Sequence, residues 1–401
     1  MVIGGGPAGM MAAIAAARQG AAVRLWEKNG SLGRKLLATG NGHCNFTNRD
    51  LAAVHFHGDR ALAVGPLSAF DGQRTLRFFK SLGIEHCWDG QGRGFPASRE
   101  ADSVLFALEQ EMARLGVAIE LRCEIVAISR VSDGFAVDQR GASHRCGAVV
   151  LACGGAAAPQ FGANGGGCEL ASQLGHTVTP IRPALVPMEI AGNWHHKLQG
   201  VRLDMSLSIA SPGNCGCTIT DEGLFTQYGL SGPLALRASR SLSAGSRATL
   251  AFLPAAQRET VRAVLGQRAA ALPARHARDF LDGWLPAKVG AMLVRESGIG
   301  PGTPVAALTA PQLDALAANC VAFPITIKSL RGMRDAQVTA GGVAGGGIDP
   351  ARLQSQLAPG LFFCGEVVDV DGDSGGYNLQ WCWSSGFVAG SAAADAVRRI
   401  R

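Results

Sequence analysis

The sequence lacks the cysteine spacings of a disulfide or zinc framework, and it lacks a long apolar run. Its eleven cysteines include no Cys-x-x-Cys pair, and Cys215-Gly-Cys217 is the one close pair. An odd, scattered set of this kind argues against structural disulfides, a metal site and dithiol disulfide-reductase chemistry. No stretch of about twenty uninterrupted apolar residues occurs, so no membrane-spanning helix is expected. These absences predict a cytoplasmic protein without a bound metal.

Charged and aromatic residues are also scarce. Charged residues make up 17% of the chain and aromatic residues 6%, whereas hydrophobic residues reach 47%. In a chain of 401 residues this balance predicts a large core and two or three domains. The net charge of +6 suits an anionic ligand or an RNA surface, but it is equally typical of ordinary solvated faces. The oligomeric state does not follow from these numbers.

Glycine, by contrast, is abundant, and its first cluster forms a dinucleotide-binding fingerprint. Residues 2–9 read Val-Ile-Gly-Gly-Gly-Pro-Ala-Gly, and an acidic residue, Glu27, ends the next expected strand. Gly4 makes the turn out of the first strand, Gly6 lets the backbone approach a pyrophosphate, and Gly9 lets the following helix pack closely. Glu27 is expected to accept hydrogen bonds from an adenosine ribose. The residues expected to bind the cofactor here are Gly4, Gly6, Pro7, Ala8, Gly9 and Glu27.

The C-terminal part indicates that the dinucleotide is FAD. Residues 361–390 contain an apolar strand, a Gly- and Asp-rich loop and a helix with small surface residues. Such a segment suits a cofactor whose ADP half lies at the first turn and whose isoalloxazine lies over a distant helix N-terminus. Glu366 or Asp369 is expected to bind the ribityl chain. Asp371 and Asp373 have a calcium-loop spacing, but the Ser-Gly-Gly that follows fits a flavin loop better. The other flavin contacts expected here are Gly365, Gly375, Gly376, Tyr377, Asn378 and Leu379.

Two further segments are expected to contact the cofactor. A basic, glycine-punctuated loop follows Glu27, in which Lys and Arg side chains offset pyrophosphate charge and glycines let the backbone lie against the ring. The alternative is an ordinary surface loop. Farther on, a small β-meander leads to a strand that ends in a glycine pair, which is expected to contact the adenosine end. The expected residues are Lys28, Arg34, Lys35, Gly40, Asn41, Gly42, Cys44, Ile125, Val126, Ala152 and Gly154.

The order of elements predicts a split α/β domain with an insertion. Helices are expected over 68–86 and 101–115, β-type alternation begins near Pro180, and helical periodicity covers 256–319. The predicted fold is a Rossmann-like FAD-binding domain of the two-dinucleotide-binding type, with an inserted β-rich domain and a small helical subdomain. No second Gly-x-Gly-x-x-Gly follows a strand, so either a nicotinamide donor docks transiently against the ring or the enzyme uses another donor. The predicted parts are 1–179 and 336–401 for the FAD-binding domain, 180–255 for the β-rich substrate domain and 256–335 for the helical subdomain.

Four motifs along the chain carry a resemblance to a known family. They are Gly-Arg-Lys-Leu-Leu-Ala-Thr-Gly-Asn-Gly-His-Cys-Asn-Phe-Thr-Asn at 33–48, Leu-Phe-Thr-Gln-Tyr-Gly-Leu-Ser-Gly-Pro at 224–233, Val-Thr-Ala-Gly-Gly-Val at 338–343, and the segment 365–380. On these residues the chain resembles the bacterial BaiN/RdsA-like flavoproteins, which have the HI0933-like fold.

The resemblance implies an FAD-binding, NAD(P)H-linked oxidoreductase. Members of the family are connected with bile-acid reduction and with the reduction of a uridine of ribosomal RNA to dihydrouridine. His43 and Gln227 stand where relatives usually have Arg and His. Because the chain departs from the family pattern at these positions, the resemblance does not imply one specific substrate.

Three side chains are candidates for the proton that accompanies hydride transfer. A flavin carries the hydride, so the protein has to supply orientation and a proton. Cys44 is the first candidate because its loop is expected beside the isoalloxazine, with simple packing as the alternative. His43 titrates nearer neutral pH, with a hydrogen bond to flavin or backbone as the alternative. Tyr377, one of two tyrosines, offers a hydroxyl, with an ordinary packed ring as the alternative.

The predicted function is that of an FAD-dependent oxidoreductase that passes hydride from NAD(P)H through the flavin to an unsaturated or carbonyl acceptor. The acceptor is either a small molecule or a uridine in structured RNA, and the sequence does not choose between them. An RNA substrate predicts a basic, aromatic-rimmed face near the flavin. The alternative from another class is a flavin-binding redox sensor or scaffold without turnover.

Overall fold

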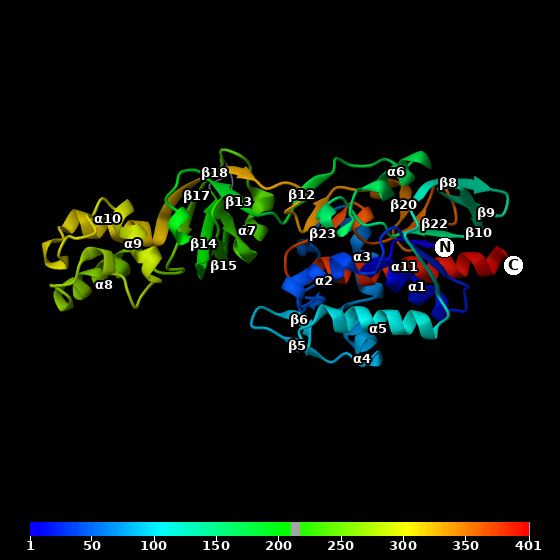
Figure 1. Ribbon diagram of the computed structural model, residues 1–401, viewed down its shortest axis with the longest axis horizontal. Helices are drawn as coiled ribbons and strands as arrows, with labels where there is room; N and C mark the ends of the chain where they lie inside the picture. The colour runs from blue at the N-terminus through cyan, green and yellow to red at the C-terminus, as the bar shows by residue number, and fades with distance from the viewer. Residues whose placement is uncertain (210–216, 401) are drawn as a thin grey trace. The chain divides into compact units, whose positions relative to one another are not determined.

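The computed structural model describes residues 1–209 and 217–400, and the chain divides into two compact units. Unit 1 comprises Met1–Ala184 and Ala336–Arg401, and unit 2 comprises Leu185–Asp335. Unit 1 is therefore built from both ends of the chain, as the blue and red segments of Figure 1 show. Each unit has its own hydrophobic core.

Unit 1 is built on a largely parallel sheet that has the first strand of the chain near its centre. The strand order is β20-β21-β22-β11-β1-β2-β7, and the five strands from β22 to β7 run parallel. The inner strands are short, apolar and fully buried, as expected where helices or loops cover both faces. This order confirms the predicted Rossmann-like α/β class. The strands are β1 (Val2–Ile3), β2 (Arg24–Glu27), β7 (Ala118–Leu121), β11 (Val149–Leu151), β20 (Ile348–Asp349), β21 (Gln354–Ser355) and β22 (Leu361–Phe363).

Two helices from opposite ends of the chain pack against each other in this unit. They are α1 (Pro7–Arg18) and α11 (Tyr377–Ile400), the blue and red helices that lie side by side in Figure 1. A Cβ atom on Gly390 would lie 2.2 Å from the carbonyl oxygen of Ala12, and one on Gly386 would lie 2.4 Å from that of Ala8. The two backbones therefore approach to a distance that only glycine on α11 permits.

Smaller sheets and helices surround this pair. The meander β8-β9-β10 was expected, whereas the pairing of β4 with β23 joins residues 56–58 to residues 370–372. The strands are β3 (Thr47–Asn48), β4 (Phe56–Gly58), β5 (His86–Trp88), β6 (Arg93–Pro96), β8 (Ile125–Val131), β9 (Gly134–Gln139), β10 (Ala142–Cys146), β12 (Arg182–Ala184), β19 (Val338–Ala340) and β23 (Val370–Gly372). The helices are α2 (Arg34–Ala38), α3 (Arg60–Ala69), α4 (Gly72–Ser81), α5 (Ala101–Arg114) and α6 (Gly166–Gln173).

The single helix predicted over 68–86 is wrong. Helix α3 ends at Ala69, and α4 begins after Asp71, whose side chain accepts a hydrogen bond from the backbone N–H of Arg74 at 2.7 Å. An aspartate in this position caps a new helix, so it divides the apolar periodic stretch in two. Helix α4 then ends at Ser81, and β5 follows from His86.

Unit 2 combines a closed barrel with a group of helices. The barrel order is β13-β16-β15-β14-β17-β18, closed by the antiparallel pairing of β18 with β13. Strand β18 belongs to the barrel, although it lies within the range 256–335 that was predicted to be a helical subdomain. Strand β12 lies within the predicted β-rich range 180–255, but it pairs with β19 inside unit 1. The strands are β13 (Met188–Ile190), β14 (Arg202–Ile209), β15 (Cys217–Phe225), β16 (Gly229–Ser231), β17 (Arg247–Ala251) and β18 (Phe323–Leu330). The helices are α7 (Gly232–Ala238), α8 (Arg258–Ala271), α9 (Ala287–Glu296) and α10 (Ala310–Ala322).

Within residues 1–209 and 217–400, no helix combines the length and the apolar character needed to cross a membrane.

The contact between α1 and α11 predicts opposite effects for two helical glycines. Gly390→Ala should lower the free energy of unfolding by about 1–3 kcal/mol, because its new methyl group meets the Ala12 backbone. Gly266→Ala on α8 is the matched control, since its Cβ would meet only the end of the Arg262 side chain, at 3.5 Å. It should gain about 0.5–1 kcal/mol from helix propensity. Urea unfolding measures both, and equal stability of the two variants would contradict the packing described.

Candidate functional site

A pocket with a volume of about 380 Å³ opens at the first strand–helix turn of unit 1. Gly4 has φ +111°, and a Cβ there would lie 2.3 Å from the carbonyl oxygen of Ala152. A Cβ on Gly9 would lie 1.9 Å from the carbonyl oxygen of Gly4, so this residue permits the tight packing of turn against helix. Gly6 differs, because a Cβ there would have no atom within 4 Å and Gly6 lines the pocket. The turn therefore presents open backbone to the pocket at one position.

Many of the predicted cofactor residues line this pocket together. They come from the first turn, the end of β2, helix α2, the start of β8, the end of β11 and the loop after β22. Gly9 packs behind the turn instead. The predicted residues that line the pocket are Gly4, Gly6, Pro7, Ala8, Glu27, Lys28, Arg34, Lys35, Ile125, Val126, Ala152, Gly154 and Glu366.

Glu27 lies at the end of β2 with both carboxylate oxygens engaged. The backbone N–H of Gly5 donates to Oε2 at 2.7 Å, and the backbone and side-chain N–H groups of Asn29 donate to Oε1 at 2.8 and 2.6 Å. The side chain is 8% exposed and lines the pocket. These contacts hold the carboxylate beside the turn, where the sequence predicts a ribose contact.

A second carboxylate, Glu366, reaches the pocket from the C-terminal segment. Lys35 Nζ lies 2.7 Å from its Oε2, and the hydroxyl of Thr339 donates to its Oε1 at 2.7 Å. The same hydroxyl accepts hydrogen bonds from the backbone N–H groups of Ala156 and Ala157, both at 2.9 Å. Thr339 therefore ties Glu366 to the loop after β11, and its side chain is 1% exposed.

The other predicted acid, Asp369, does not line this pocket. Its Oδ2 accepts a hydrogen bond from the Thr179 hydroxyl at 2.9 Å, and its backbone carbonyl accepts from Asp59 N–H at 2.7 Å. Of the two acids considered for the ribityl chain, Glu366 is the one at the pocket.

The glycine-rich loop before β3 lies outside the pocket lining. Gly40, Asn41 and Gly42 all have positive φ, at +58°, +55° and +87°. The His43 ring is tied to backbone, with Nδ1 2.7 Å from the carbonyl oxygen of Arg99. Cys44 is fully buried, and burial raises the pKa of its thiol to about 12. A thiol this weakly acidic is a poor proton donor at neutral pH, so the geometry favours the packing alternative for Cys44.

Apart from Glu366, the predicted C-terminal flavin residues do not line the pocket: Gly365 lies in the turn after β22, and Gly375 to Leu379 form the start of α11 and the turn before it. Gly375 and Gly376 have φ +130° and +99°, and a Cβ on Gly376 would lie 2.3 Å from the carbonyl oxygen of Thr47. The Asn378 side chain accepts from Gly372 N–H at 2.8 Å and donates to the Gly372 carbonyl at 2.8 Å. Gly365 donates its N–H to the Ser385 hydroxyl at 2.9 Å, while Tyr377 and Leu379 are buried. These residues fix the loop that leads into α11.

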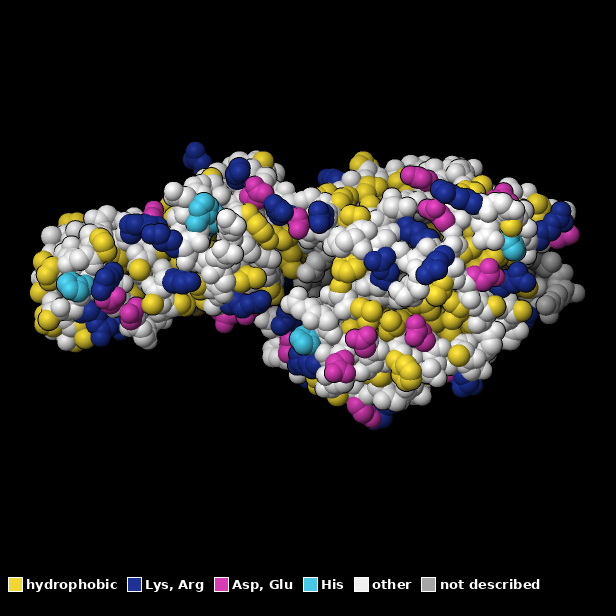
Figure 2. Space-filling view, viewed as in Figure 1, with side chains coloured by type: hydrophobic (Ala, Val, Ile, Leu, Met, Phe, Trp, Pro, Cys, Tyr) yellow, Lys and Arg dark blue, Asp and Glu magenta, His cyan; other side chains and the backbone are white. Residues whose placement is uncertain are grey.

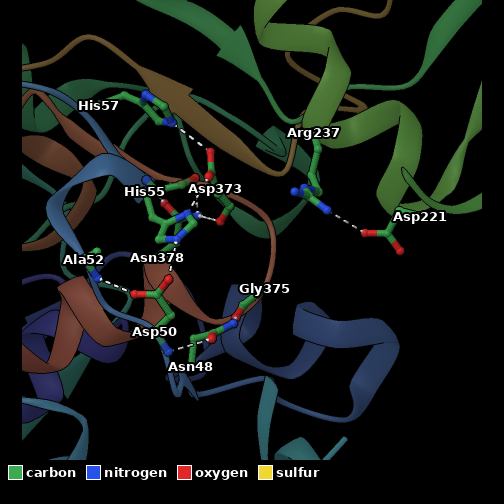
Figure 3. A network of polar contacts seen from close by, with 11 residues as sticks. Asn48, Asp50, Ala52, His55, His57, Asp221, Arg237, Asp373, Gly375 and Asn378 are labelled. Carbon is green, nitrogen blue, oxygen red and sulfur yellow. Dashed lines mark hydrogen bonds and ion pairs between the residues drawn. The ribbon is translucent and has the colours of Figure 1, made fainter. Parts of the chain in front are cut away.

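A polar cluster beside this loop was missed by the sequence analysis. His57 Nε2 lies 2.7 Å from Asp373 Oδ1, His55 Nδ1 lies 3.0 Å from Asp373 Oδ2, and His55 Nε2 lies 3.1 Å from Asp50 Oδ2 (Figure 3). Burial alone would raise the pKa of Asp373, but the hydrogen bonds with His57 and His55 outweigh it and lower that pKa. The signal was present as His-Phe-His at 55–57 and Asp-Gly-Asp at 371–373, since alternate residues share a face of a strand.

The pocket also has a wall that no sequence motif indicated. It includes Arg140 from the turn after β9 and Glu169 and Gln173 from α6. Arg140, Glu169 and Gln173 reach the pocket through tertiary packing, so spacing along the chain does not identify them. Cys153 and Cys382, which lie within the segments predicted to contact the cofactor, also line the pocket, and burial raises the pKa of each thiol to about 12, which keeps both neutral.

Among the residues that the structure describes, no group of three or more His, Cys, Asp or Glu side chains is arranged to hold an ion. Cys215 of the Cys215-Gly-Cys217 pair lies outside the described residues, and Cys217 is a free, exposed thiol.

The hydroxyl of Thr339 makes three hydrogen bonds, one to Glu366 and two from backbone N–H groups, so its removal should destabilise the protein. Thr339→Val keeps the shape of the side chain but leaves the N–H groups of Ala156 and Ala157 without their acceptor. We expect a loss of about 1–3 kcal/mol in the free energy of unfolding. Thr339→Ser keeps the hydroxyl and should lose clearly less. Urea unfolding measures the free energy of unfolding of both variants. If Thr339→Val were as stable as Thr339→Ser, the hydroxyl would not hold the loop as described.

Comparison with known proteins places the chain among characterised relatives over almost its entire length. The 3-dehydro-bile acid delta(4,6)-reductase of Clostridium scindens is 37% identical, and the alignment covers 98% of each chain. The ribosomal RNA dihydrouridine synthase of Escherichia coli is 30% identical, and the alignment covers 97% of this chain and 96% of that protein.

Solved structures show the same fold at low sequence identity. The open conformation of a flavocytochrome c3 fumarate reductase has a TM-score of 0.50 and 17% identity, and the match covers 99% of this chain and 78% of that one. The 3-ketosteroid delta1-dehydrogenase of Sterolibacterium denitrificans has a TM-score of 0.50 and 12% identity, with 98% of each chain covered. A family model described as the HI0933-like protein Rossmann domain matches residues 1–392. The chain therefore belongs to the HI0933-like family, as its motifs indicated.

Proposed function

We propose that the protein is an FAD-dependent oxidoreductase that passes a hydride through the flavin from NAD(P)H to an unsaturated or carbonyl acceptor. The observation that carries the proposal is the open backbone at Gly6, which faces a pocket that also contains Glu27 and Glu366. A turn of this kind at a helix N-terminus stabilises phosphate groups. One carboxylate from each end of the split domain suits a cofactor with two sugar-like parts.

The residues present fit FAD along the pocket. The backbone of the first turn and the N-terminus of α1 would hold the pyrophosphate, and Glu27 would accept from the adenosine ribose. The backbone at Ile125 and Val126 would face the adenine, and Glu366, held by Lys35 and Thr339, would bind the ribityl chain. FAD, when bound, supplies hydride transfer, and the chain supplies binding, orientation and a proton.

None of the three predicted donors lines the pocket, and we assign the proton to Tyr377 among them. Cys44 is fully buried with a strongly raised pKa, and the His43 ring is tied to the Arg99 carbonyl. Tyr377 is the first residue of α11, and a helix N-terminus stabilises the negative charge that forms when a phenol gives up its proton. We therefore assign the donor role to Tyr377.

The nicotinamide is proposed to dock transiently, since the one dinucleotide fingerprint is assigned to FAD. The names of two relatives define the acceptor classes. One is a bile acid reductase, which favours a small unsaturated acceptor, and the other forms dihydrouridine in ribosomal RNA. On the face shown in Figure 2, dark blue and magenta side chains are interspersed, whereas an RNA surface is typically a continuous basic patch. That face therefore gives no support to an RNA acceptor, and a small molecule and a uridine in RNA stay as the two candidate acceptors.

Two further assignments belong to the same proposal. Unit 2, with its barrel and helices, is proposed to select the acceptor, following the predicted β-rich and helical parts at 180–255 and 256–335. The described cysteines are all free, which supports the proposal that the protein works in the cytoplasm.

The alternative function is a flavin-binding redox sensor or scaffold without turnover.

Substitution of Gly6 separates folding from cofactor binding. Gly6→Ala adds a methyl group where no protein atom lies within 4 Å, and φ at this residue is −81°. The free energy of unfolding of the apo-protein should change by less than about 0.5 kcal/mol. The methyl group would occupy pyrophosphate space, so we expect FAD affinity to fall at least tenfold, or about 1.4 kcal/mol. Flavin fluorescence titration measures the affinity, and an unchanged dissociation constant would contradict the pocket assignment.

Reduction of the flavin tests turnover directly. FAD-loaded protein is mixed anaerobically with NADH or NADPH in a stopped-flow instrument, and the absorbance of the oxidised flavin is followed. The proposal predicts bleaching whose rate saturates with one of the two nucleotides. Added acceptor, tested first as enones and then as ribosomal RNA fragments, should restore the absorbance. No bleaching with either nucleotide would favour the sensor or scaffold alternative.

A further inference from the structure

The cluster of Asp50, His55, His57 and Asp373 lies outside the pocket and has no part in the function proposed so far. Its members come from the segment before β4, from β4 itself and from the loop between β23 and α11. Figure 3 shows the two histidines turned toward Asp373, with Asp50 on the far side of His55. The hydrogen-bonded order is Asp50, His55, Asp373, His57.

The chain holds Asp373 firmly in this position. Its backbone N–H donates to the carbonyl oxygen of His55 at 2.9 Å, and its own carbonyl accepts from the Asn378 side chain at 3.2 Å. The antiparallel pairing of β23 with β4 aligns Gly372 with Phe56. The carboxylate therefore stays between the two imidazoles without depending on their charge.

The His55 ring faces a carboxylate on each side. Nδ1 lies 3.0 Å from Asp373, and Nε2 lies 3.1 Å from Asp50. A neutral imidazole has one N–H group, so it could donate to only one of these carboxylates and would turn a lone pair toward the other. The imidazolium donates to both. The ring therefore lies between two acceptors, and 25% of its side chain is exposed to solvent.

The same ring lies against Tyr377. The two ring centroids are 4.6 Å apart and the planes differ by 24°, which is a stacked arrangement. Phe56 packs edge-on against the Tyr377 ring, with the ring centroids 5.9 Å apart and the planes at 88°. Tyr377 is 6% exposed, so its ring is fixed between these neighbours and the start of α11.

We propose that His55 is a positioning residue for the proton donor Tyr377: its ring, held between Asp50 and Asp373, orients the phenol by stacking and, as an imidazolium, stabilises the phenolate left after proton transfer. This inference rests on the proposed function, because it takes Tyr377 as the donor. In the step itself the Tyr377 O–H bond breaks and a C–H bond forms at the acceptor carbon beside the one that receives the hydride. The electron pair of the O–H bond stays on the phenol oxygen until water reprotonates it.

The charged surroundings of Tyr377 determine the sign of the effect. His55 is the group stacked on the ring, and its two nitrogens face Asp50 and Asp373. His57 Nε2 lies 2.7 Å from the other oxygen of Asp373. Asp371, which lies on β23 shortly before Tyr377 in the sequence, is also buried. The first turn of α11 contains no acidic residue. A positive group within about 4–6 Å favours the charged form of an acid by about 1–3 pH units. The two carboxylates reduce this, so we expect the lower end of that range.

The test uses the fact that the chain has only two tyrosines, Tyr228 and Tyr377. In a Tyr228→Phe background, Tyr377 is the one phenol, and its ionisation can be followed by the ultraviolet absorbance of the phenolate in the full-length protein. Addition of His55→Phe keeps an aromatic ring for stacking but removes the charge, and the acid dissociation constant of Tyr377 should fall about tenfold.

His57→Gln is the matched control, because it removes the partner of the other Asp373 oxygen and leaves the His55 ring on Tyr377. It should move the Tyr377 ionisation much less than His55→Phe does. An unchanged ionisation in His55→Phe, or an equal shift in His57→Gln, would overturn the inference. Far-ultraviolet circular dichroism at each pH confirms that the variants remain folded through the titration.

The titration needs neither flavin nor substrate, so its result does not depend on whether the proposed function is correct. If NAD(P)H does not reduce the flavin but the Tyr377 shift is found, the proposed function fails and the electrostatic coupling stands. If turnover is found and its rate in His55→Phe keeps the wild-type pH profile, the positioning role of His55 fails and the proposed function stands. With the role as stated, the alkaline limb of kcat/KM moves to higher pH in His55→Phe and disappears in Tyr377→Phe.

Discussion

The architecture of unit 1 depends on how closely its first and last helices approach each other. Gly386 and Gly390 on α11 lie against the backbone of Ala8 and Ala12 on α1, at separations that leave no room for a Cβ. This contact closes a domain whose two segments are separated by the whole of unit 2. It also sets the start of α11, and with it Tyr377, relative to the first turn. A dinucleotide pocket with residues from both ends of the chain requires a close contact of this kind between the two segments.

The pocket and the polar cluster use the same structural principle at a smaller scale. In each, a carboxylate from the C-terminal segment is fixed by a partner from the N-terminal part of the chain: Glu366 by Lys35, with Thr339 as a second partner, and Asp373 by His55 and His57. Buried or half-buried carboxylates are tolerated there because each oxygen has a hydrogen-bond partner. The acids are therefore positioned before any ligand binds, which is the arrangement that a redox site needs to act with little reorganisation.

Much of this could be predicted from the sequence where the signal is local. The glycine spacing at Gly4, Gly6 and Gly9 indicated the turn, and Glu27 does lie beside it. The class of fold and the family followed from the same motifs. The roles assigned to individual residues, including the FAD contacts, remain predictions. The helix over 68–86 failed because the cap at Asp71 outweighs an apolar periodicity that continues through it.

Contacts between distant segments were beyond the reach of spacing arguments. Thr339 lies in the motif at 338–343, but the motif did not indicate that its hydroxyl joins Glu366 to the loop at Ala156. The His55–Asp373 pair depends on the register of β4 against β23, which the two short strands do not reveal in isolation. Asp373 was considered for a metal or flavin loop, whereas the structure makes it a partner of two imidazoles. Long-range pairing of this kind is a property of the fold rather than of any one segment.

Binding of one FAD per chain in this pocket is tested by reconstituting the full-length protein with FAD, removing free flavin by gel filtration, denaturing the protein and quantifying the flavin released. We expect close to one FAD per chain, eluting together with the folded protein. Folded protein that elutes without FAD would show that the pocket does not bind the cofactor.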